Sequence, residues 1–383
     1  MNTFVEQIFN YLSDNWAIFI IVISSVAVVV QWIYYLLFYS RILQKESPLQ
    51  GNIQPPVSVI ICARNEEENL RKNLPKILNQ KYPNFEVFVA LDACTDESET
   101  LIRTLLENYT NLRYTIIPKD PKFHHGKKVA LTIAIKGAKH EHLLLTDADC
   151  YPASEHWISE MVKPFNQGYQ LVLGYGKYSG KKSLLNKLVR YETFFIAQQY
   201  LGMAKAGIPY MGVGRNLAYT KELYYKEKGF AKHAHIESGD DDLFVNAVAN
   251  KQNCYPVYSP QAHTLSEAPK SFKSWIYQKR RHFKTFSIYK RKHKFLLFAE
   301  PITREICWIL PLTLLFNPVW MYYGVGIFLA RFLVFLTVTK LNLQKLNEQK
   351  LIFFAPLFDL ILPWLHLWIW GLNQLSPRKN IWK

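Results

Sequence analysis

The first long apolar stretch of the chain lies near its N-terminus. Residues 16–39 contain only three polar side chains, and about 24 residues of this kind are enough to cross a bilayer as one helix. Two acidic residues and no Lys or Arg precede the stretch, whereas Arg41 and Lys45 follow it. Because basic residues favour the cytoplasmic side of a span, we expect residues 1–15 to lie outside the cytoplasm and the following chain inside it.

A second apolar region, residues 295–372, predicts a C-terminal membrane region of two or three helices, and a basic tail, 373–383, follows it. The candidate spans are 304–322, 324–339 and 351–372. The first two are irregular, so one of them could lie in the membrane interface instead. The charge rule cannot place both the lysines after the second candidate and the basic tail in the cytoplasm, so the number of spans stays open.

Between the apolar regions the pattern changes to short apolar runs that alternate with amphipathic stretches. A Pro-rich linker, 40–55, leads into a predicted cytoplasmic domain at 56–294. The pattern predicts strands at 57–61, 85–90, 114–117 and 143–145 and helices at 67–80, 97–108 and 129–139. This alternation is typical of an α/β domain with a mainly parallel sheet, which binds ligands beyond the carboxyl ends of its strands.

The position of the positive charge matters more than its size. The formal net charge is +16, and eight Lys or Arg residues lie between residues 278 and 294, directly before the C-terminal apolar region. Such a run is attracted to the anionic lipid of the cytoplasmic leaflet. We therefore expect the membrane to be a partner of the chain and expect no nucleic-acid partner.

The predicted strand at 143–145 leads into two carboxylates. Asp147 and Asp149 are separated by one residue, so in an extended chain both side chains point to the same side. Carboxylate oxygens are the ligands that Mg²⁺ and Mn²⁺ prefer, and such a cation can also hold a substrate diphosphate. An Asp-x-Asp pair alone is weak support for a metal site, because acidic turns after strands are common.

Three further polar segments strengthen the prediction that Asp147 and Asp149 bind a metal ion. Residues 62–70 follow the first predicted strand, residues 91–98 follow the second, and residues 126–131 open the helix before the acidic pair. Their order and spacing resemble those of the inverting family 2 glycosyltransferases of GT-A fold, in their membrane-anchored form, over roughly residues 56–290. The resemblance implies a Rossmann-like GT-A domain flanked by N- and C-terminal transmembrane helices.

The resemblance also implies a set of residues that meet a nucleotide-sugar donor. In the family the first two loops cradle the nucleotide, so Glu66 and Asp92 would accept from the N–H of a uracil-like base and Asn65 would offer it an amide. Lys127 would supply a cation near the donor. The expected donor-binding residues are Ala63, Asn65, Glu66, Asp92, Lys127 and Asp147. Helix capping is the alternative interpretation of Asn65, Glu66 and Asp92.

The same resemblance assigns the acidic pair to a divalent cation, Mg²⁺ or Mn²⁺. Asp149 would bind the cation directly, and Asp147 would reach the donor ribose or the cation. The cation would neutralise the diphosphate as it leaves. His263 is a weaker candidate for a third ligand, because a single loop histidine seldom binds metal.

The expected general base lies in residues 237–244. An inverting transfer needs a base that takes the proton of the acceptor hydroxyl. When the segment is aligned on Leu243, Asp240 takes the place of the family's base and Gly239 stands where the family has Glu. This departure leaves Asp241 as the alternative base, and the run of acids could instead complement the dipole of the helix that follows.

Two other segments resemble the acceptor and leaving-group side of family members. Residues 211–219 resemble the segment under the donor sugar, and Trp275, Gln278 and Arg281 share one face at helical spacing. The family's Gln-x-x-Arg-Trp motif is matched except that His282 replaces the Trp. Bidentate arginines suit a leaving diphosphate. The expected residues are Gly214, Arg215, Asn216, Trp275, Gln278, Arg280 and Arg281.

Together these features predict an inverting, metal-dependent glycosyltransferase of the inner membrane with a cytoplasmic catalytic domain. The donor would be a nucleotide-diphospho sugar, with UDP preferred, and the acceptor a lipid-linked or nascent glycan. A processive polysaccharide synthase is one alternative, although the absent motif Trp argues against it. A non-enzymatic membrane scaffold that binds a nucleotide is the other.

Overall fold

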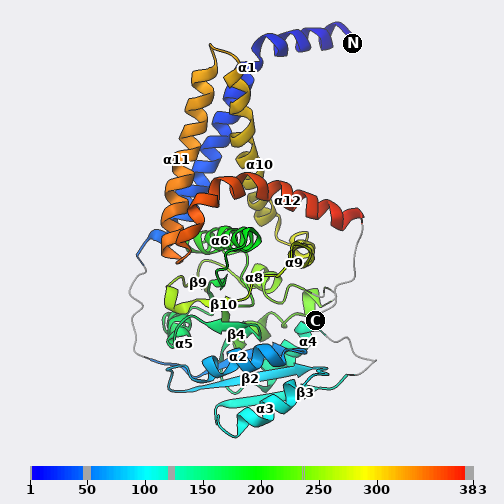
Figure 1. Ribbon diagram of the computed structural model, residues 1–383, viewed down its shortest axis with the longest axis vertical. Helices are drawn as coiled ribbons and strands as arrows, with labels where there is room; N and C mark the ends of the chain where they lie inside the picture. The colour runs from blue at the N-terminus through cyan, green and yellow to red at the C-terminus, as the bar shows by residue number, and fades with distance from the viewer. Residues whose placement is uncertain (1, 46–52, 120–125, 235, 237, 376–383) are drawn as a thin grey trace.

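The computed structural model describes residues 2–45, 53–119, 126–234, 236 and 238–375 (Figure 1). An α/β domain forms one end of the molecule and a bundle of long helices forms the other. Residues 46–52 of the 40–55 linker and residues 376–383 of the basic tail lie outside the described residues, as does Glu237 of the acidic segment.

The α/β domain is built on a sheet of seven strands in the order β3-β2-β1-β4-β8-β6-β9. The first four strands of this order are parallel to one another, and β8 is antiparallel to both β4 and β6. The expectation of a mainly parallel sheet in an α/β domain is therefore confirmed. The strands are β1 (Val57–Ala63), β2 (Phe85–Asp92), β3 (Leu112–Ile117), β4 (His142–Asp147), β6 (Leu171–Leu173), β8 (Leu217–Thr220) and β9 (Cys254–Pro256).

The register of the central strands brings the carboxyl ends of β1, β2 and β4 to one edge of the sheet, and a loop begins at each of these ends. Ala63 pairs with Leu91 of β2, and Cys62 pairs with Asp147 of β4. The chain moves from β1 outward to β2 and β3, and β4 then returns to the other side of β1. Such a reversal of strand order leaves a crevice beyond the carboxyl ends of β1 and β4, where ligands of doubly wound sheets bind.

Alternate side chains of each strand enter two different cores, because successive residues of a strand point to opposite faces. Val57, Val59 and Ile61 join one core, and Ile60 joins the other. The first core also contains residues of α2 (Glu67–Leu78), α3 (Ser98–Leu106) and α5 (Trp157–Val162). The second contains residues of α4 (Lys127–Gly137), α6 (Leu184–Lys205), α7 (Lys221–Lys226), α8 (Asp242–Val248) and α9 (Phe272–Phe286).

A smaller sheet of three strands lies beside the carboxyl end of β4. Its order is β5-β10-β7, with β10 antiparallel to β5 and parallel to β7. Because β5 begins three residues after the end of β4, this sheet fixes the direction in which the chain leaves the two aspartates. The strands are β5 (Cys150–Pro152), β7 (Gly176–Tyr178) and β10 (Thr264–Ser266).

The helical part contains three segments that are long and apolar enough to cross a membrane, at 15–43, 321–345 and 350–375 of the described chain. The first is α1 (Asn2–Trp32), which continues through a π-helical turn (Ile33–Phe38) and a 3₁₀ turn (Tyr39–Leu43). The others are α11 (Met321–Lys345) and α12 (Ala355–Leu375), with a 3₁₀ turn (Gln349–Phe354) before α12.

The bounds of the helices in the C-terminal region differ from the candidate ranges 304–322 and 324–339. The chain instead turns at residues 314–320, between α10 (Arg291–Thr313) and α11. Pro311 lies within α10 without ending it, whereas Asn317 and Pro318 lie in the turn. Apolar composition alone did not mark the break, because both arms and the turn between them are apolar.

The four long helices do not run in one direction. α1, α10 and α11 pack side by side as a bundle, whereas α12 crosses the end of the bundle nearest the α/β domain (Figure 1). α12 packs against α6 and α9 of the domain on one side and against α10 and α11 on the other. The end of the first apolar segment also contacts α6 closely, since a Cβ at Gly202 would lie 2.5 Å from the carbonyl oxygen of Phe38.

A buried network of four charges joins α10, α11 and α12. Arg304 donates to Glu300 at 2.6 Å, and Arg331 lies 2.6 Å from Asp359. Arg304 also lies 3.6 Å from Asp359, and all four residues are at most 3% exposed. Because two arginines face two carboxylates, the network brings no net charge into the apolar surroundings.

We expect Asp359→Asn to destabilise the protein, because Arg304 and Arg331 would then share Glu300 alone. Removing one partner of a buried ion pair costs about 3–5 kcal/mol of the free energy of unfolding. The measurement is the Tm of the detergent-purified protein. Glu155→Gln removes an exposed ion pair with Lys81 and is the control, with an expected cost below about 1 kcal/mol. Equal Tm values for the two variants would contradict a stabilising role of the network.

Candidate active site

Asp147 and Asp149 lie at the carboxyl end of β4, on either side of a tight turn into β5. Their carboxylate oxygens and the Cys150 sulfur all lie within 4.8 Å of one another, which is close enough for one cation. The Cys150 thiol donates to Asp149 at 3.3 Å, and burial together with Asp149 raises the pKa of this thiol. A protonated thiol is a poor ligand for a hard cation, so the two carboxylates are the donors that fit Mg²⁺ or Mn²⁺.

Lys127, the first residue of α4, bridges two parts of the fold. Its ammonium lies 2.7 Å from Asp147 and 3.0 Å from Asp240. Burial disfavours the charged lysine, but these two carboxylates hold the pKa of Lys127 well above its ordinary value. In turn, although burial opposes it, Lys127 holds the pKa of Asp147 below its ordinary value.

The three consecutive aspartates at the start of α8 have different surroundings. Asp241 accepts hydrogen bonds from the backbone N–H of Gly214 at 2.7 Å and of Asp242 at 2.8 Å, and thereby caps α8. Burial and the flanking acids raise the pKa of Asp241 to about 7. Asp242 accepts from the hydroxyls of Thr285 and Tyr289. Among the described residues, only Lys127 pairs with the Asp240 carboxylate, so its second oxygen makes no hydrogen bond there.

The backbone at Gly214 lies close to the side chains of Lys127, Asp240 and Asp241. A Cβ at this position would lie 3.2 Å from the Lys127 nitrogen and 3.4 Å from an Asp241 oxygen. A side chain at position 214 would therefore require the Lys127 ammonium to shift by a few tenths of an ångström. A glycine here lets its own N–H reach Asp241.

Arg215 and Gln278 share one aromatic partner at the edge of the site. The Arg215 guanidinium lies 4.4 Å from the centre of the Tyr178 ring and donates to Ser266 at 3.3 Å. Gln278 of α9 donates to the Tyr178 hydroxyl at 3.0 Å. The hydroxyl of Thr146, the neighbour of Asp147, donates to the Arg215 carbonyl oxygen at 3.0 Å. The charges of Arg215 and Arg281 add to that of Lys127 in lowering the pKa of Asp147.

The first two loops meet above the carboxyl ends of β1 and β2. The Asn65 oxygen accepts from the backbone N–H of Thr95 at 2.7 Å, and the Asn65 backbone is left-handed at φ 54°. Burial raises the pKa of Glu66, the Asn69 amide that donates to Glu66 lowers it, and the charge of Asp149 raises it. The helix-capping bond at the start of α2 comes from Asp96, which accepts from the Glu67 N–H at 3.0 Å. Neither Asn65 nor Glu66 caps α2 through its side chain.

Several residues expected at the site direct their side chains to partners within the fold. Asn216 is fully buried and holds the Trp157 indole and two backbone carbonyls, and Trp275 is fully buried with its indole bonded to Glu192. Arg280 donates to Asn373 of α12. These three positions therefore hold the fold together, because their polar atoms already have partners away from the acidic pair. Ala63 and Asp92 are also buried, at the ends of β1 and β2.

His263 is not part of the candidate cation site among the described residues. It is fully buried, its Nε2 lies 3.3 Å from the Tyr258 carbonyl oxygen, and its ring packs edge-on against Tyr175. The third group beside the aspartates is Cys150 instead. Its position directly after Asp149 in the sequence was the available signal for it. Tyr178, which meets both Arg215 and Gln278, had no such signal.

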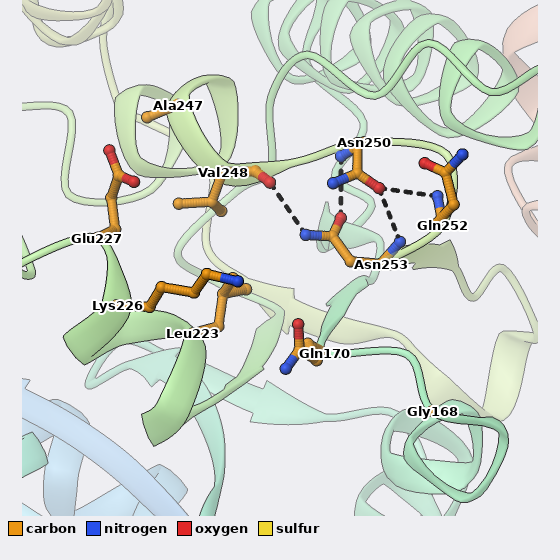
Figure 2. Close-up of a pocket in the computed structure, with 10 residues that line it drawn as sticks. All are labelled: Gly168, Gln170, Leu223, Lys226, Glu227, Ala247, Val248, Asn250, Gln252 and Asn253. Atoms are coloured by element: carbon orange, nitrogen blue, oxygen red, sulfur yellow. Dashed lines mark hydrogen bonds between the residues drawn. The ribbon is translucent and has the colours of Figure 1, made fainter.

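A separate surface pocket of about 430 Å³ lies at the far end of α8 from Asp241 (Figure 2). Its lining includes Lys226 of α7, Gln170 and the turn from Asn250 to Asn253. Hydrogen bonds within the turn occupy the Asn250 oxygen and both ends of the Asn253 amide. None of the residues described above as part of the acidic cluster lines this pocket.

Comparisons with known proteins agree with this geometry. Residues 58–226 match the glycosyl transferase family 2 model. The chain is 27% identical over 247 residues to "Probable glycosyltransferase YdaM" of Bacillus subtilis, covering 59% of this chain and 54% of that protein. It is 24% identical over 178 residues to a poly-beta-1,6-N-acetyl-D-glucosamine synthase of Staphylococcus epidermidis, covering 45% and 42%. The chain spans about half the length of these curated relatives.

A solved structure extends the similarity of fold beyond the family match. The mannosyltransferase PcManGT from Pyrobaculum calidifontis, in complex with GDP-Man and Mn²⁺, superposes with a TM-score of 0.62 at 18% identity. The alignment covers 95% of this chain and 99% of that one, so it includes the helical part as well as the sheet. The chain therefore contains a glycosyl transferase family 2 domain of GT-A fold.

Proposed function

We propose that the protein is an inverting, metal-dependent glycosyltransferase that uses a nucleotide-diphospho sugar. The observation that carries this proposal is that carboxylate oxygens of Asp147 and Asp240 both lie within 3.0 Å of the Lys127 ammonium, beside Asp149. One cation-binding pair and one carboxylate with a free oxygen are the two groups that such a transfer requires. The family 2 domain and its glycosyltransferase relatives support the same reaction class.

The donor diphosphate would lie between the acidic pair and the basic side chains around it. Asp149 and Asp147 would hold Mg²⁺ or Mn²⁺, which when bound neutralises the charge that develops on the diphosphate. Lys127 pairs with Asp147, and Arg215 and Arg281 act on the same carboxylate through their charges, so these three side chains would contact the phosphate oxygens. Asn65 and Glu66, on the loop above, would contact the nucleotide base, and we propose uracil as that base.

Asp240 is the general base of the proposed reaction. It would accept the proton of the acceptor hydroxyl while that oxygen forms a bond to the anomeric carbon, and the bond from this carbon to the diphosphate would break on the opposite face. Asp240 has an oxygen available for this proton, whereas both oxygens of Asp241 accept backbone N–H groups. Asp241 would therefore position the Gly214 loop and α8.

The acceptor is proposed to be a lipid-linked or nascent glycan at the cytoplasmic face of the inner membrane. Three apolar segments adjoin the domain, and α9, which carries Gln278 and Arg281, packs directly against α12. Arg41 follows the first apolar segment and Lys345 ends α11, which supports a cytoplasmic position for the domain between them. A membrane-borne acceptor would thus reach the site along α9.

A processive synthase is the main alternative, and one curated relative is named as a polysaccharide synthase. His282 occupies the place of the motif Trp that family synthases keep, which argues for a single transfer or a short product. The size of the labelled product distinguishes the two reactions. Turnover of a nucleotide sugar by the purified protein alone would exclude a non-enzymatic scaffold.

We expect Asp149→Asn to lower the rate of sugar transfer by roughly 100-fold or more, because the cation then has one carboxylate ligand fewer. The assay incubates purified protein and extracted lipid acceptors with a panel of radiolabelled nucleotide sugars and Mn²⁺. Glu155→Gln, which removes an exposed carboxylate, should retain full activity. Full activity of Asp149→Asn, or of the wild type in excess chelator, would remove the cation from the mechanism.

Asp240→Asn and Asp241→Asn should fail in different ways. Asp240→Asn should leave donor binding intact but slow transfer by roughly 10²–10⁴-fold, the usual contribution of a general base. Its Tm should also fall, because Lys127 loses one of its two carboxylate partners. In Asp241→Asn the amide oxygen can still cap α8, but the NH2 group cannot accept from the Gly214 N–H. Leaving that N–H without a partner should lower Tm, at a cost of about 1–3 kcal/mol of the free energy of unfolding. If Asp241→Asn stops transfer in a fully stable protein while Asp240→Asn remains active, the base is Asp241.

A further inference from the structure

Three polar side chains of α12 recur at seven-residue intervals and therefore lie on one face of the helix. Asp359, His366 and Asn373 all point into the protein, and each has a partner there. Together these contacts extend over two-thirds of the helix. They attach α12 to the rest of the protein along most of its length.

The partners come from three different helices. Asp359 lies 2.6 Å from Arg331 of α11, and His366 lies 2.6 Å from Glu192 of α6. Burial alone would raise the pKa of Glu192, but Lys279 and His366 hold it at about 2, so this carboxylate is charged under α12. Asn373 accepts from the Arg280 side chain at 2.7 Å and donates to the Arg280 carbonyl oxygen at 2.9 Å.

The opposite face of α12 is apolar and exposed. Between Ala355 and Leu375 the only ionisable side chains are Asp359 and His366, and both belong to the protein-facing side. The residues on that face are Leu357, Trp364 and Trp368, which are 48–51% exposed. Leu367 and Trp370 are also exposed, but they lie nearer to the protein-facing side of the helix. Tryptophans are enriched where a helix meets the boundary between lipid headgroups and acyl chains.

The direction of α12 decides between a helix that crosses the bilayer and one that lies on it. α1, α10 and α11 run together as a bundle, and α12 crosses that bundle at its domain end (Figure 1). A helix across the axis of a membrane bundle lies in the plane of the membrane. If α12 instead crossed the bilayer, the partners of His366 and Asn373 on α6 and α9 would have to be abandoned.

We propose that α12 is an interfacial helix whose apolar face enters the headgroup boundary of the bilayer. Its polar face is covered by the α/β domain, which replaces the charged face that a free amphipathic helix presents to water. α9 carries Gln278 and Arg281 and is tied to α12 directly through Arg280. Lys279 adds an indirect link, because it pairs with Glu192, which also contacts His366 of α12. The bilayer surface then fixes the position of one wall of the site.

An interfacial α12 also removes a conflict in the charge rule, which could not place both the lysines at the end of α11 and the basic tail in the cytoplasm. With α12 in the interface, α10 and α11 form a hairpin, and Lys340 and Lys345 lie on the same side as the domain. The basic residues 378, 379 and 383 then follow on that side too. Both basic segments are cytoplasmic, as the charge rule requires.

The test measures membrane depth at two pairs of positions in the full-length protein in liposomes. Spin labels at Leu357→Cys and Trp368→Cys are eleven residues apart on one face of α12, which is about 16 Å along the helix. Tyr322→Cys and Leu333→Cys form the matched pair on α11, and all four side chains are exposed. Relative accessibility to oxygen and to a water-soluble nickel complex reports depth.

The proposal predicts equal, shallow depths for the α12 pair and clearly different depths for the α11 pair. Different depths within the α12 pair would show that α12 crosses the bilayer. If the α12 labels are accessible to the nickel complex but poorly accessible to oxygen, the helix lies in water. If they are accessible to neither reagent, the helix lies against a second copy of the chain. Each of these three results overturns the proposal, and none depends on sugar transfer.

A second measurement leaves the helices unaltered. A cysteine added after Lys383, in a Cys94→Ser background, is labelled with a membrane-impermeant maleimide in oriented vesicles. It should react from the same side as Lys182→Cys of the domain and from the side opposite to Val319→Cys in the turn between α10 and α11. Labelling from the Val319 side would contradict the interfacial placement.

Discussion

The Lys127 ammonium is held between carboxylates from two distant segments, and the arrangement of the candidate site depends on it. Asp147 comes from the end of β4 and Asp240 from the loop before α8. Without a cation between them, these acids would repel each other and Asp149 inside a half-buried space. Gly214 allows the approach, because a Cβ there would lie 3.2 Å from the ammonium. The lysine thus fixes the distance between the cation-binding pair and the proposed base.

Buried ion pairs also join the helical part to the domain. Glu192 of α6 meets Lys279 of α9 and His366 of α12, and Arg190 pairs with the nearly inaccessible Glu348. Such pairs contribute little net stability compared with apolar contacts, but losing one partner is costly. They therefore select one position of α12 and α9 among many that apolar packing would allow. The same position presents Gln278 to Tyr178 and, through it, to Arg215.

Much of the fold followed from local sequence patterns, because the central strands are short apolar runs bounded by polar loops. The predicted strands at 57–61, 85–90 and 143–145 lie within β1, β2 and β4, and a parallel register then brings Asn65 and Asp147 to one edge. The burial of Asn216 and Trp275 could not be predicted, since it depends on partners from α5, from α6 and from the residue before β7. Hydropathy likewise found α12 but not its direction, which is set by the partners of Asp359, His366 and Asn373.

The central claim is that Asp147 and Asp149 hold a divalent cation at the position of a nucleoside diphosphate. Electron paramagnetic resonance of free Mn²⁺ tests it directly, because the signal of the free ion falls when the ion binds. We predict that the wild-type protein binds one Mn²⁺, that UDP tightens this binding, and that Asp149→Asn abolishes it while Glu155→Gln does not. Equal Mn²⁺ binding by the wild type and Asp149→Asn would contradict the account.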